Sequence, residues 1–295
     1  MNSTRMKIII QDEWTSMNIE ELFRNIWEFP KKVMHELRMD KAVSVNGQVI
    51  NWNTPLKHKD EIIINLRESH DVDTPSPHPL EILYEDDYLL AVNKPAGMAT
   101  HPNENEKNSL VNAVAYYLQS TEQIHKARHI HRLDKNTTGV VLFAKNALSK
   151  VVLDKMLNDR KIKRTYWALA DGIIKRRKGD ITAPIGRDRH HPTRRRVSKT
   201  GQQAITHYNV LETFLKENLS LIECSLDTGR THQIRVHLSY IGHPLSGDKL
   251  YGGSAHFQRQ ALHARKLEFT HPFTLDNIQV IAPFLDNPPI FEQFL

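Results

Sequence analysis

The chain has 295 residues, of which 39% are hydrophobic and 25% are charged, a balance that excludes a largely disordered protein. No stretch approaches the roughly 18 consecutive apolar residues of a membrane span, and the patch Ile8–Ile10 is too short for a secretory signal. The formal net charge of +6 and the isoelectric point near 9.2 favour a polyanionic partner such as DNA or RNA.

The residues before position 68 alternate strand-like and helix-like patterns. Asn46-Gly47 is the commonest two-residue hairpin signal, and it separates two short strand-like stretches. The expected elements are strands at residues 7–11, 42–45, 48–51 and 62–64 and helices at residues 18–28 and 31–38. Two helices followed by such a hairpin and a further strand resemble the S-four-type RNA-binding module, and a purely structural α/β cap is the alternative.

A change in composition follows this block. Residues 68–79 read ESHDVDTPSPHP, a polar stretch whose alternating prolines suit an extended linker. We therefore expect an S-four-like module at residues 1–68, a linker at residues 69–80 and a larger domain at residues 81–295.

The larger domain combines short strands with a few helices. Apolar residues recur at helical spacing from Leu110 to Leu118, and Asn146 is a plausible cap for a second helix at residues 147–157. Because helices do not separate the strands regularly, an α+β fold with a mainly antiparallel mixed sheet fits best. The expected strands lie at residues 89–92, 140–144, 165–170, 204–211, 220–226 and 278–282.

A polar stretch, HRLDKNTTG at residues 131–139, stands directly before the apolar strand at 140–144. Asp134 therefore lies on a loop held by the sheet, which is where catalytic groups are often found. An aspartate in a turn more often bonds its own backbone, so the motif alone leaves a structural part open for Asp134.

Basic residues gather in three clusters between positions 161 and 199. Such clusters are the electrostatic footprint of a phosphate backbone, and a solvated basic surface is the alternative. We expect the last cluster to be a mobile RNA-binding loop, with a solvated hairpin as the other interpretation. The clusters are Lys161, Lys163 and Arg164; Lys175, Arg176, Arg177 and Lys178; and Arg187, Arg189, Arg194, Arg195, Arg196 and Lys199.

The single cysteine and the 17 histidines point to no metal site. Cys224 excludes an intramolecular disulfide, fits a reducing, cytoplasmic compartment, and is expected to be a small buried residue in an alternating apolar stretch. The histidine pairs match no standard metal-ligand spacing and lack cysteine partners, so contacts to phosphate or to turns explain them better.

Residues 228–238, TGRTHQIRVHL, admit two interpretations. As a helix, they place His232, Arg235 and Ser239 on one face, and a strand with alternating apolar residues is the alternative. In the helix, Arg235 is a fixed cation that could keep a carboxylate ionised and oriented in a shielded pocket. A structural ion pair or a phosphate contact would use the same residue.

Taken together, these segments resemble the RluA-type pseudouridine synthases. The similarity rests on HRLDKNTTG, on TGRTHQIRVHLSYIGHPLSGDKLYGG at residues 228–253, on NKPAG with His101-Pro102, on KRTYWAL at residues 163–169, and on Leu262-His263-Ala264. It extends over about residues 80–285, with order and spacing preserved. Thr138 stands where serine is commoner in the family.

The resemblance implies a role for each matching residue. Asp134 would be the catalytic carboxylate, Arg235 its ionic partner, and Tyr166 the aromatic floor that stacks on the target base and removes a proton late in the reaction. Arg132 would hold the RNA helix open after the base has left its stack. Further substrate contacts are expected from His131, Leu133, Thr138, Arg230 and His232, and RNA contacts from Lys163, Arg164, Arg187, Arg194, Arg195 and Arg196.

The implied reaction is an isomerisation that breaks a nitrogen–carbon glycosidic bond, rotates the uracil and forms a carbon–carbon bond to the same sugar. It requires no cofactor and no metal, and the sequence has no phosphate-binding glycine loop or dinucleotide fingerprint. The family resemblance implies a monomer. The N-terminal module implies large-subunit ribosomal RNA as the substrate, because such a module usually accompanies ribosomal RNA specificity in the family, and transfer RNA is the alternative. A catalytically silent RNA-binding or assembly protein and a base-excising glycosylase are the competing functions.

Overall fold

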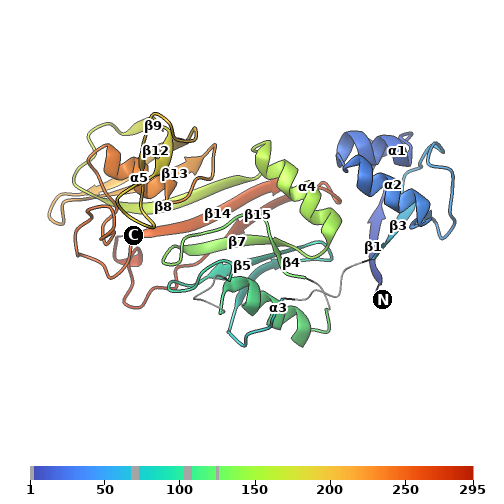
Figure 1. Ribbon diagram of the computed structural model, residues 1–295, viewed down its shortest axis with the longest axis horizontal. Coiled ribbons are helices and arrows are strands. Elements are labelled where there is room, and N and C mark those ends of the chain that lie inside the picture. Colours follow the sequence, from blue (N-terminus) through green and yellow to red (C-terminus); the bar gives the residue numbers. More distant parts are fainter. Residues whose placement is uncertain (1–2, 68–72, 103–107, 124–125, 295) are drawn as a thin grey trace.

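The computed structural model describes residues 3–67, 73–102, 108–123 and 126–294 (Figure 1). A small N-terminal unit of strands and short helices lies at one end of a much larger sheet. None of the described helices is long and apolar enough to cross a membrane.

The N-terminal unit folds around a cluster of aromatic side chains. Phe23 and Trp27 are fully buried, and Trp14 and Trp52 pack edge-on against them. Three antiparallel strands in the order β1-β3-β2 form its sheet, and the helix expected at residues 31–38 is confirmed. The elements are β1 (Ser3–Ile9), α1 (Ile19–Glu21), a π-helical turn η2 (Leu22–Ile26), α2 (Lys31–Met39), β2 (Val43–Val45) and β3 (Glu61–Arg67).

The hairpin expected around Asn46-Gly47 is only half right. Both residues have the positive φ that a tight turn requires, 51° and 80°. The strand predicted at residues 48–51 is wrong, however, because only a single bridge from Val45 to Gln48 follows the turn. β2 pairs instead with β3, whose isoleucines are buried, whereas Val49 remains 60% exposed.

The N-terminal unit and the large sheet share an apolar contact. Trp27 packs edge-on against Phe273 with 5.4 Å between the ring centroids, and its Nε1 donates a hydrogen bond to the Pro272 carbonyl at 3.0 Å. The hydroxyl of Tyr88 bonds the carbonyl of Lys7 beside this contact. The two units are therefore joined by packing as well as by the chain.

Part of the expected linker, residues 68–72, lies outside the described residues. Residues 73–80 have no regular secondary structure, as expected for an extended segment. They run along helix α3 (Leu110–Ser120), where the Asn112 side chain donates to the Thr74 carbonyl at 2.7 Å and the Ser76 amide donates to the Asn112 carbonyl at 3.0 Å. This part of the segment is thus held against the larger unit.

The large sheet has ten strands within the described residues, and its main path runs β4-β5-β7-β14-β8-β13-β12-β9. All of its ladders are antiparallel except β14 with β7, which confirms the α+β class with a mainly antiparallel mixed sheet. Its strands are β4 (Glu81–Glu85), β5 (Leu89–Lys94), β6 (Arg128–His129), β7 (Thr138–Ala144), β8 (Lys163–Asp171), β9 (Lys178–Thr182), β12 (Ile205–Phe214), β13 (Leu219–Leu226), β14 (Leu262–Thr270) and β15 (Asn277–Ile281).

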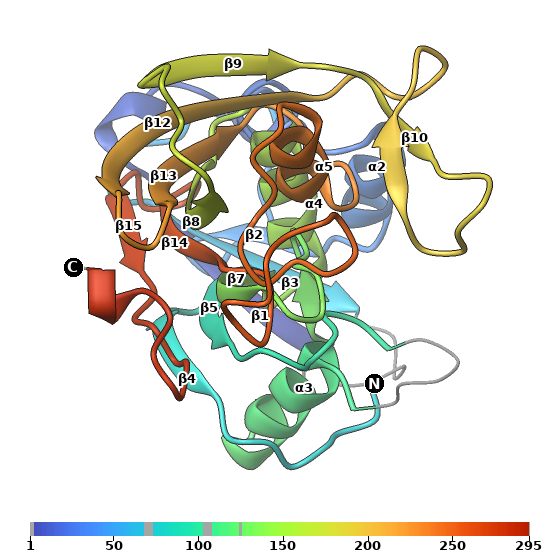
Figure 2. The ribbon, with the colours of Figure 1, turned by 90° about the vertical axis from the view of Figure 1, so that its left-hand side faces the viewer.

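Helices and a separate ribbon complete the fold (Figure 2). Besides α3, the helices are α4 (Ala147–Asn158), capped by Asn146 as expected, and α5 (Gln233–Tyr240). The helical interpretation of residues 228–238 is therefore right from Gln233 onward, whereas residues 228–232 lie before the helix. The basic run expected to be a loop forms an antiparallel two-stranded ribbon, β10 (Ile185–Arg187) with β11 (Arg195–Val197), at the edge of the molecule. The run is therefore a hairpin in form, whereas its predicted contact with RNA stays a prediction.

The parallel ladder between β7 and β14 fixes where the loop of Asp134 ends. Gly139 pairs with Ala264 there, with a φ of +111°. A Cβ atom at Gly139 would lie 2.3 Å from the Ala264 carbonyl oxygen, so only glycine allows the two backbones to approach this closely. The glycine of the HRLDKNTTG stretch is thus a packing requirement that positions the polar loop before it.

Candidate active site

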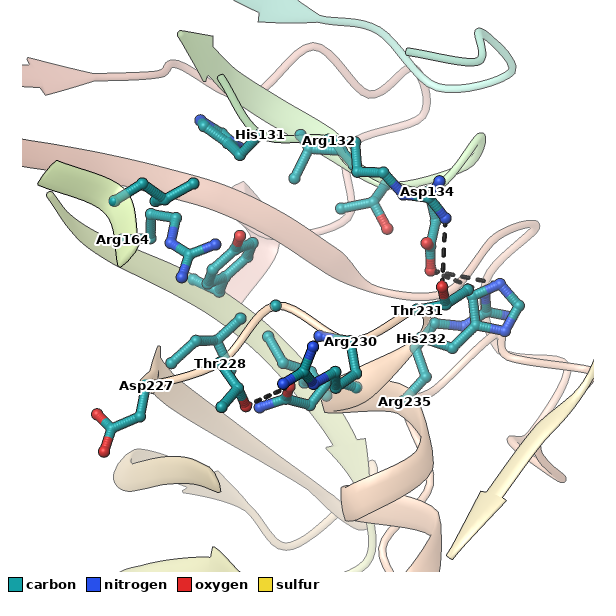
Figure 3. A pocket seen from close by; sticks show the side chains of 18 of the residues that line it. His131, Arg132, Asp134, Arg164, Asp227, Thr228, Arg230, Thr231, His232 and Arg235 are labelled. Carbon is teal, nitrogen blue, oxygen red and sulfur yellow. Dashed lines mark hydrogen bonds and ion pairs between the residues drawn. The ribbon is translucent and has the colours of Figure 1, made fainter. Parts of the chain in front are cut away.

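Three segments of the large unit supply most of the lining of a cavity of about 530 Å³, and Leu157, Asn158, Arg160 and Leu262 supply the rest. One segment is the loop from Ile130 to Thr137, the second runs from Leu226 into α5, and the third is the start of β8 (Figure 3). Segments separated by a hundred residues therefore contribute side chains to one site, which we call the catalytic pocket.

Asp134 and Arg235 meet at this cavity, as the sequence predicted. An Nη1 hydrogen of Arg235 is donated to Asp134 Oδ2 at 3.0 Å, and the same guanidinium binds Asp248 through two further bonds, Nε to Oδ2 at 2.7 Å and Nη2 to Oδ1 at 3.0 Å. Asp248 is almost fully buried, whereas the Asp134 side chain keeps 19% of its surface exposed. Arg235 is thus fixed by one carboxylate and orients the other toward the cavity (Figure 3).

Burial disfavours the charged form of Arg235, but the hydrogen bonds and negative charges of Asp248 and Asp134 outweigh it. The pKa of Arg235 is consequently raised, and the guanidinium keeps its charge at every physiological pH. A permanent cation beside Asp134 therefore compensates the charge of that carboxylate.

The loop of Asp134 is held by groups outside the pocket. Thr100 both accepts from the Leu133 amide at 3.1 Å and donates to the Leu133 carbonyl at 2.9 Å. The fully buried Lys94 donates to the Lys135 carbonyl at 2.9 Å, and Arg259 donates to the Asn136 carbonyl at 3.2 Å. Because the residues on both sides of Asp134 are bonded to the scaffold, its backbone has little freedom to move.

Tyr166 lies on β8 and faces the cavity with 5% of its surface exposed. Burial raises the pKa of its phenol, so the hydroxyl remains protonated at neutral pH. A buried aromatic face beside an accessible carboxylate can receive a planar base, since stacking on an aromatic side chain contributes about 1–3 kcal/mol per base.

His232 begins α5 in a left-handed conformation, with a φ of 59°. Its Nδ1 lies 2.8 Å from the Tyr251 hydroxyl and its Nε2 lies 3.8 Å from Asp134 Oδ2. Burial lowers the pKa of His232 despite the nearby Asp134, which favours a neutral ring. The strained backbone therefore aims an imidazole at the aspartate.

His131 and Arg164 lie on the opposite side of the cavity from Arg235 (Figure 3). Burial lowers the pKa of His131 to about 3, so its ring is neutral, and its Nε2 accepts from the Leu142 amide at 3.3 Å. Neither His131 Nδ1 nor Arg164 Nε has a hydrogen-bond partner within the described part of the chain. Both atoms are buried, so a ligand with acceptor oxygens would complete their bonding.

The remaining predicted substrate residues divide into two groups. Leu133, Arg132 and Arg230 line the cavity, and Arg132 is exposed, with its Nη2 3.3 Å from the Thr231 hydroxyl. Thr138 lies outside the cavity wall and is 1% exposed. Its hydroxyl accepts from Arg259 and contacts His263, so we correct its predicted substrate contact to a structural part in the loop.

The predicted RNA-binding residues are also distributed over different surfaces. Arg164 belongs to the cavity wall, whereas Lys163 is exposed at the outer end of β8. The other four arginines lie on or beside the β10–β11 ribbon, where Arg187 and Arg195 line a second, smaller cavity: Arg187, Arg194, Arg195 and Arg196.

Three residues that complete the site were not predicted. Asp248 holds Arg235, Tyr251 holds His232, and Asp227 marks the outer end of the cavity, where its Oδ2 lies 3.0 Å from Arg160 Nη1. Asp248 and Tyr251 fall within the long motif at residues 228–253, and that motif was the only signal for them. Within the described residues, no group of three histidine, cysteine or acidic side chains is placed to hold a metal ion.

Family models match both units of the chain. Residues 88–240 match the family model described as RNA pseudouridylate synthase, and residues 6–62 match the model of the RluD ribosomal pseudouridine synthase N-terminal domain. The first match contains Asp134, Tyr166 and Arg235, and the second spans most of the N-terminal unit.

Individual proteins resemble the chain over most of its length. An uncharacterized RNA pseudouridine synthase of Bacillus subtilis is 44% identical over 95% of this chain and 93% of its own. The ribosomal large subunit pseudouridine synthase D of Neisseria meningitidis serogroup A is 40% identical over 82% of this chain and 70% of its own. Among solved structures, human RNA pseudouridylate synthase domain containing 1 superposes with a TM-score of 0.58 at 26% identity, over 70% of this chain and 84% of that one.

Proposed function

The chain belongs to the RNA pseudouridylate synthase family, and from this premise we propose that it isomerises selected uridines of large-subunit ribosomal RNA to pseudouridine. RNA is the partner on which such enzymes act. The observation that carries the proposal is an accessible Asp134 carboxylate, oriented by the Asp248-bound Arg235 and placed beside a buried aromatic face.

The geometry suits a base that has left its stack. A uridine inside a duplex cannot reach the Asp134 carboxylate, so the base must be extruded into the cavity. Tyr166 would support the extruded uracil, and the exposed guanidinium of Arg132 at the rim of the cavity would occupy the vacated position in the RNA. Breaking one bond to the sugar and forming another leaves the redox state and the mass of the RNA unchanged.

Large-subunit ribosomal RNA is the favoured substrate because of the N-terminal unit. That unit matches a domain described for a ribosomal pseudouridine synthase, and several similar proteins bear the name ribosomal large subunit pseudouridine synthase D. We further propose a cytoplasmic monomer whose residues 1–68 contact the RNA and whose residues 81–295 perform the reaction. Transfer RNA is the second candidate substrate.

The test is a map of pseudouridine in total cellular RNA from cells with and without this protein. One or a few sites in large-subunit ribosomal RNA should disappear and return with the wild-type chain, but not with Asp134→Asn. Sites lost from transfer RNA would replace the proposed substrate, and free uracil as a product would indicate a glycosylase. An unchanged map would favour an RNA-binding protein without activity.

A further inference from the structure

A second cavity, of about 370 Å³, adjoins the catalytic pocket. Arg230 and Thr231 line both cavities, so together they form the wall between them. The far wall of the second cavity is the β10–β11 ribbon, which contributes Arg187 and Arg195. We call this second space the ribbon pocket.

The register of the ribbon sets two like charges against each other. Arg187 pairs directly with Arg195 in the antiparallel ladder, so both side chains lie on one face, while Arg196 lies on the other. Like charges directly opposite each other on a sheet destabilise it. Arg230 adds a third guanidinium to the same cavity, whose lining includes no acidic residue.

Carboxylates do not relieve this charge. Within the described residues, none of these three arginines has an ion pair, although Arg194 on the same ribbon lies 3.8 Å from Asp188. The Nε of Arg195 is buried without a hydrogen-bond partner. A buried donor left unpaired costs about 1–3 kcal/mol, so a ligand that brings a hydrogen-bond acceptor to Arg195 Nε would remove this cost.

The backbone segments that line the cavity are closely packed. A Cβ atom at Gly201 would lie 2.5 Å from the Ile185 carbonyl carbon, so a glycine is required where this segment closes on β10. Ile185 and Gln202 exchange both backbone hydrogen bonds at 2.9 Å. These contacts hold the segment after the ribbon against β10 and give the cavity a fixed floor.

One contact ties the ribbon pocket to the catalytic pocket. The Arg195 amide donates to the Tyr251 hydroxyl at 2.9 Å, and that hydroxyl also lies 2.8 Å from His232 Nδ1. The guanidinium of Arg235 stands 5.0 Å from the centre of the Tyr251 ring. An anion held by Arg195 would therefore have a defined position relative to Asp134.

We propose that the ribbon pocket binds one phosphodiester group of the RNA strand adjacent to the extruded uridine, through Arg187, Arg195 and Arg230. This inference rests on the proposed function, since it takes RNA as the polyanion. Guanidinium groups suit phosphate oxygens because they can donate two parallel hydrogen bonds. A phosphate between Arg187 and Arg195 attracts both guanidinium groups and so offsets their mutual repulsion. It also fixes the RNA strand beside the catalytic pocket.

Two neighbouring arginines provide a matched test. Arg195→Ala removes one charge from the pocket face, and Arg196→Ala removes one charge from the opposite face of the same ribbon. Affinity for a short RNA hairpin with a uridine in its loop is measured over a range of salt concentrations. Arg195→Ala should weaken binding about tenfold and reduce the slope of log affinity against log salt by about 0.7–0.9, the value of one phosphate contact. Arg196→Ala should change the slope by less than half as much.

Inorganic phosphate serves as a second probe. At equal ionic strength, phosphate should raise the melting temperature of the wild type and of Arg196→Ala above the value in chloride, and this gain should vanish in Arg195→Ala. Arg187→Ala, at an exposed position, repeats the test should Arg195→Ala fold poorly.

Three outcomes would overturn the proposal. An unchanged salt slope in both Arg195→Ala and Arg187→Ala excludes an RNA phosphate at this position. Equal losses of RNA affinity in Arg195→Ala and Arg196→Ala would indicate a diffuse positive surface. A rise in melting temperature with phosphate, without any change in the salt slope of RNA binding, would indicate a site for free phosphate. Because none of these readouts uses turnover, an inactive wild type would refute the proposed function separately.

Discussion

The catalytic pocket and the β10–β11 ribbon use arginine in opposite ways. In the pocket, Arg235 is buried and bound to two carboxylates, so its charge is compensated before any ligand arrives. On the ribbon, Arg187 faces Arg195 and neither has a carboxylate partner within the described residues. The two regions therefore have different tasks. The protein itself orients the reacting carboxylate, whereas the arginines of the ribbon obtain their ion-pair partner only when RNA binds.

Removing the reacting carboxylate should have the largest effect. Asp134→Asn keeps the shape of the side chain but removes its charge, and turnover should fall by about 10⁴-fold or more. RNA affinity should remain within about twofold, because the phosphate-binding arginines are elsewhere. Pseudouridine formation and RNA binding are measured on the same preparations. Joint loss of affinity and fold would instead make Asp134 a structural residue.

A substitution at Asp248, which holds Arg235 on the side away from the cavity, tests how the pocket is preorganised. Asp248→Asn weakens the fixed partner of a buried cation, and the free energy of unfolding should fall by about 3 kcal/mol. Glu36→Gln is the control, since the ion pair of Glu36 with Lys32 on α2 is exposed and should contribute less than about 1 kcal/mol. Urea denaturation measures both, and equal losses would show that burial of the Arg235 pair adds nothing.

The aromatic floor should matter less than the carboxylates. Tyr166→Ala removes stacking on the extruded base and should weaken RNA binding by about 1–3 kcal/mol, whereas Tyr166→Phe should retain the affinity. Fluorescence titration with one RNA separates the two variants. A turnover defect in Tyr166→Phe at normal affinity would assign the hydroxyl a part in proton transfer. Equal affinity in all three proteins would remove Tyr166 from the base-binding surface.

Buried histidines should make the large sheet sensitive to acid. Burial lowers the pKa of His131 to about 3 and that of His263 to about 4, so the unfolded chain takes up protons below about pH 6.5 that the native protein does not bind. Stability should therefore fall as the pH drops from about 6.5 toward 4, by at most about 1.4 kcal/mol per pH unit for each ring.

The matched variants for this pH effect are His131→Gln and His35→Gln. His131→Gln should flatten the fall in the denaturation midpoint with decreasing pH, while His35→Gln, an exposed position on α2, should leave it as in the wild type. The same slope in all three proteins would contradict the assignment to His131.

The sequence predicted the reacting pair better than the structure that supports it. Asp134 stands in a short polar stretch and Arg235 in a predicted helix, whereas Asp248, thirteen residues farther along the same long motif, carries no local pattern that indicates an ion pair. β14 was not predicted because Arg265 and Lys266 interrupt its apolar alternation, at a position where its register with β8 shifts. Pairing partners depend on competition between distant strands, so the opposition of Arg187 to Arg195 also required the three-dimensional fold.

The burial of the single cysteine makes it a probe of local opening in the large sheet. Cys224 is fully buried on β13, directly opposite Tyr166 on β8, and burial raises the pKa of its thiol to about 12. Since the thiolate is the form that attacks alkylating reagents, Cys224 in the folded protein should react with them very slowly. The rate at which Cys224 is alkylated therefore reports how often β13 and β8 open locally next to Tyr166. The protein thus contains a natural probe of local unfolding at the site.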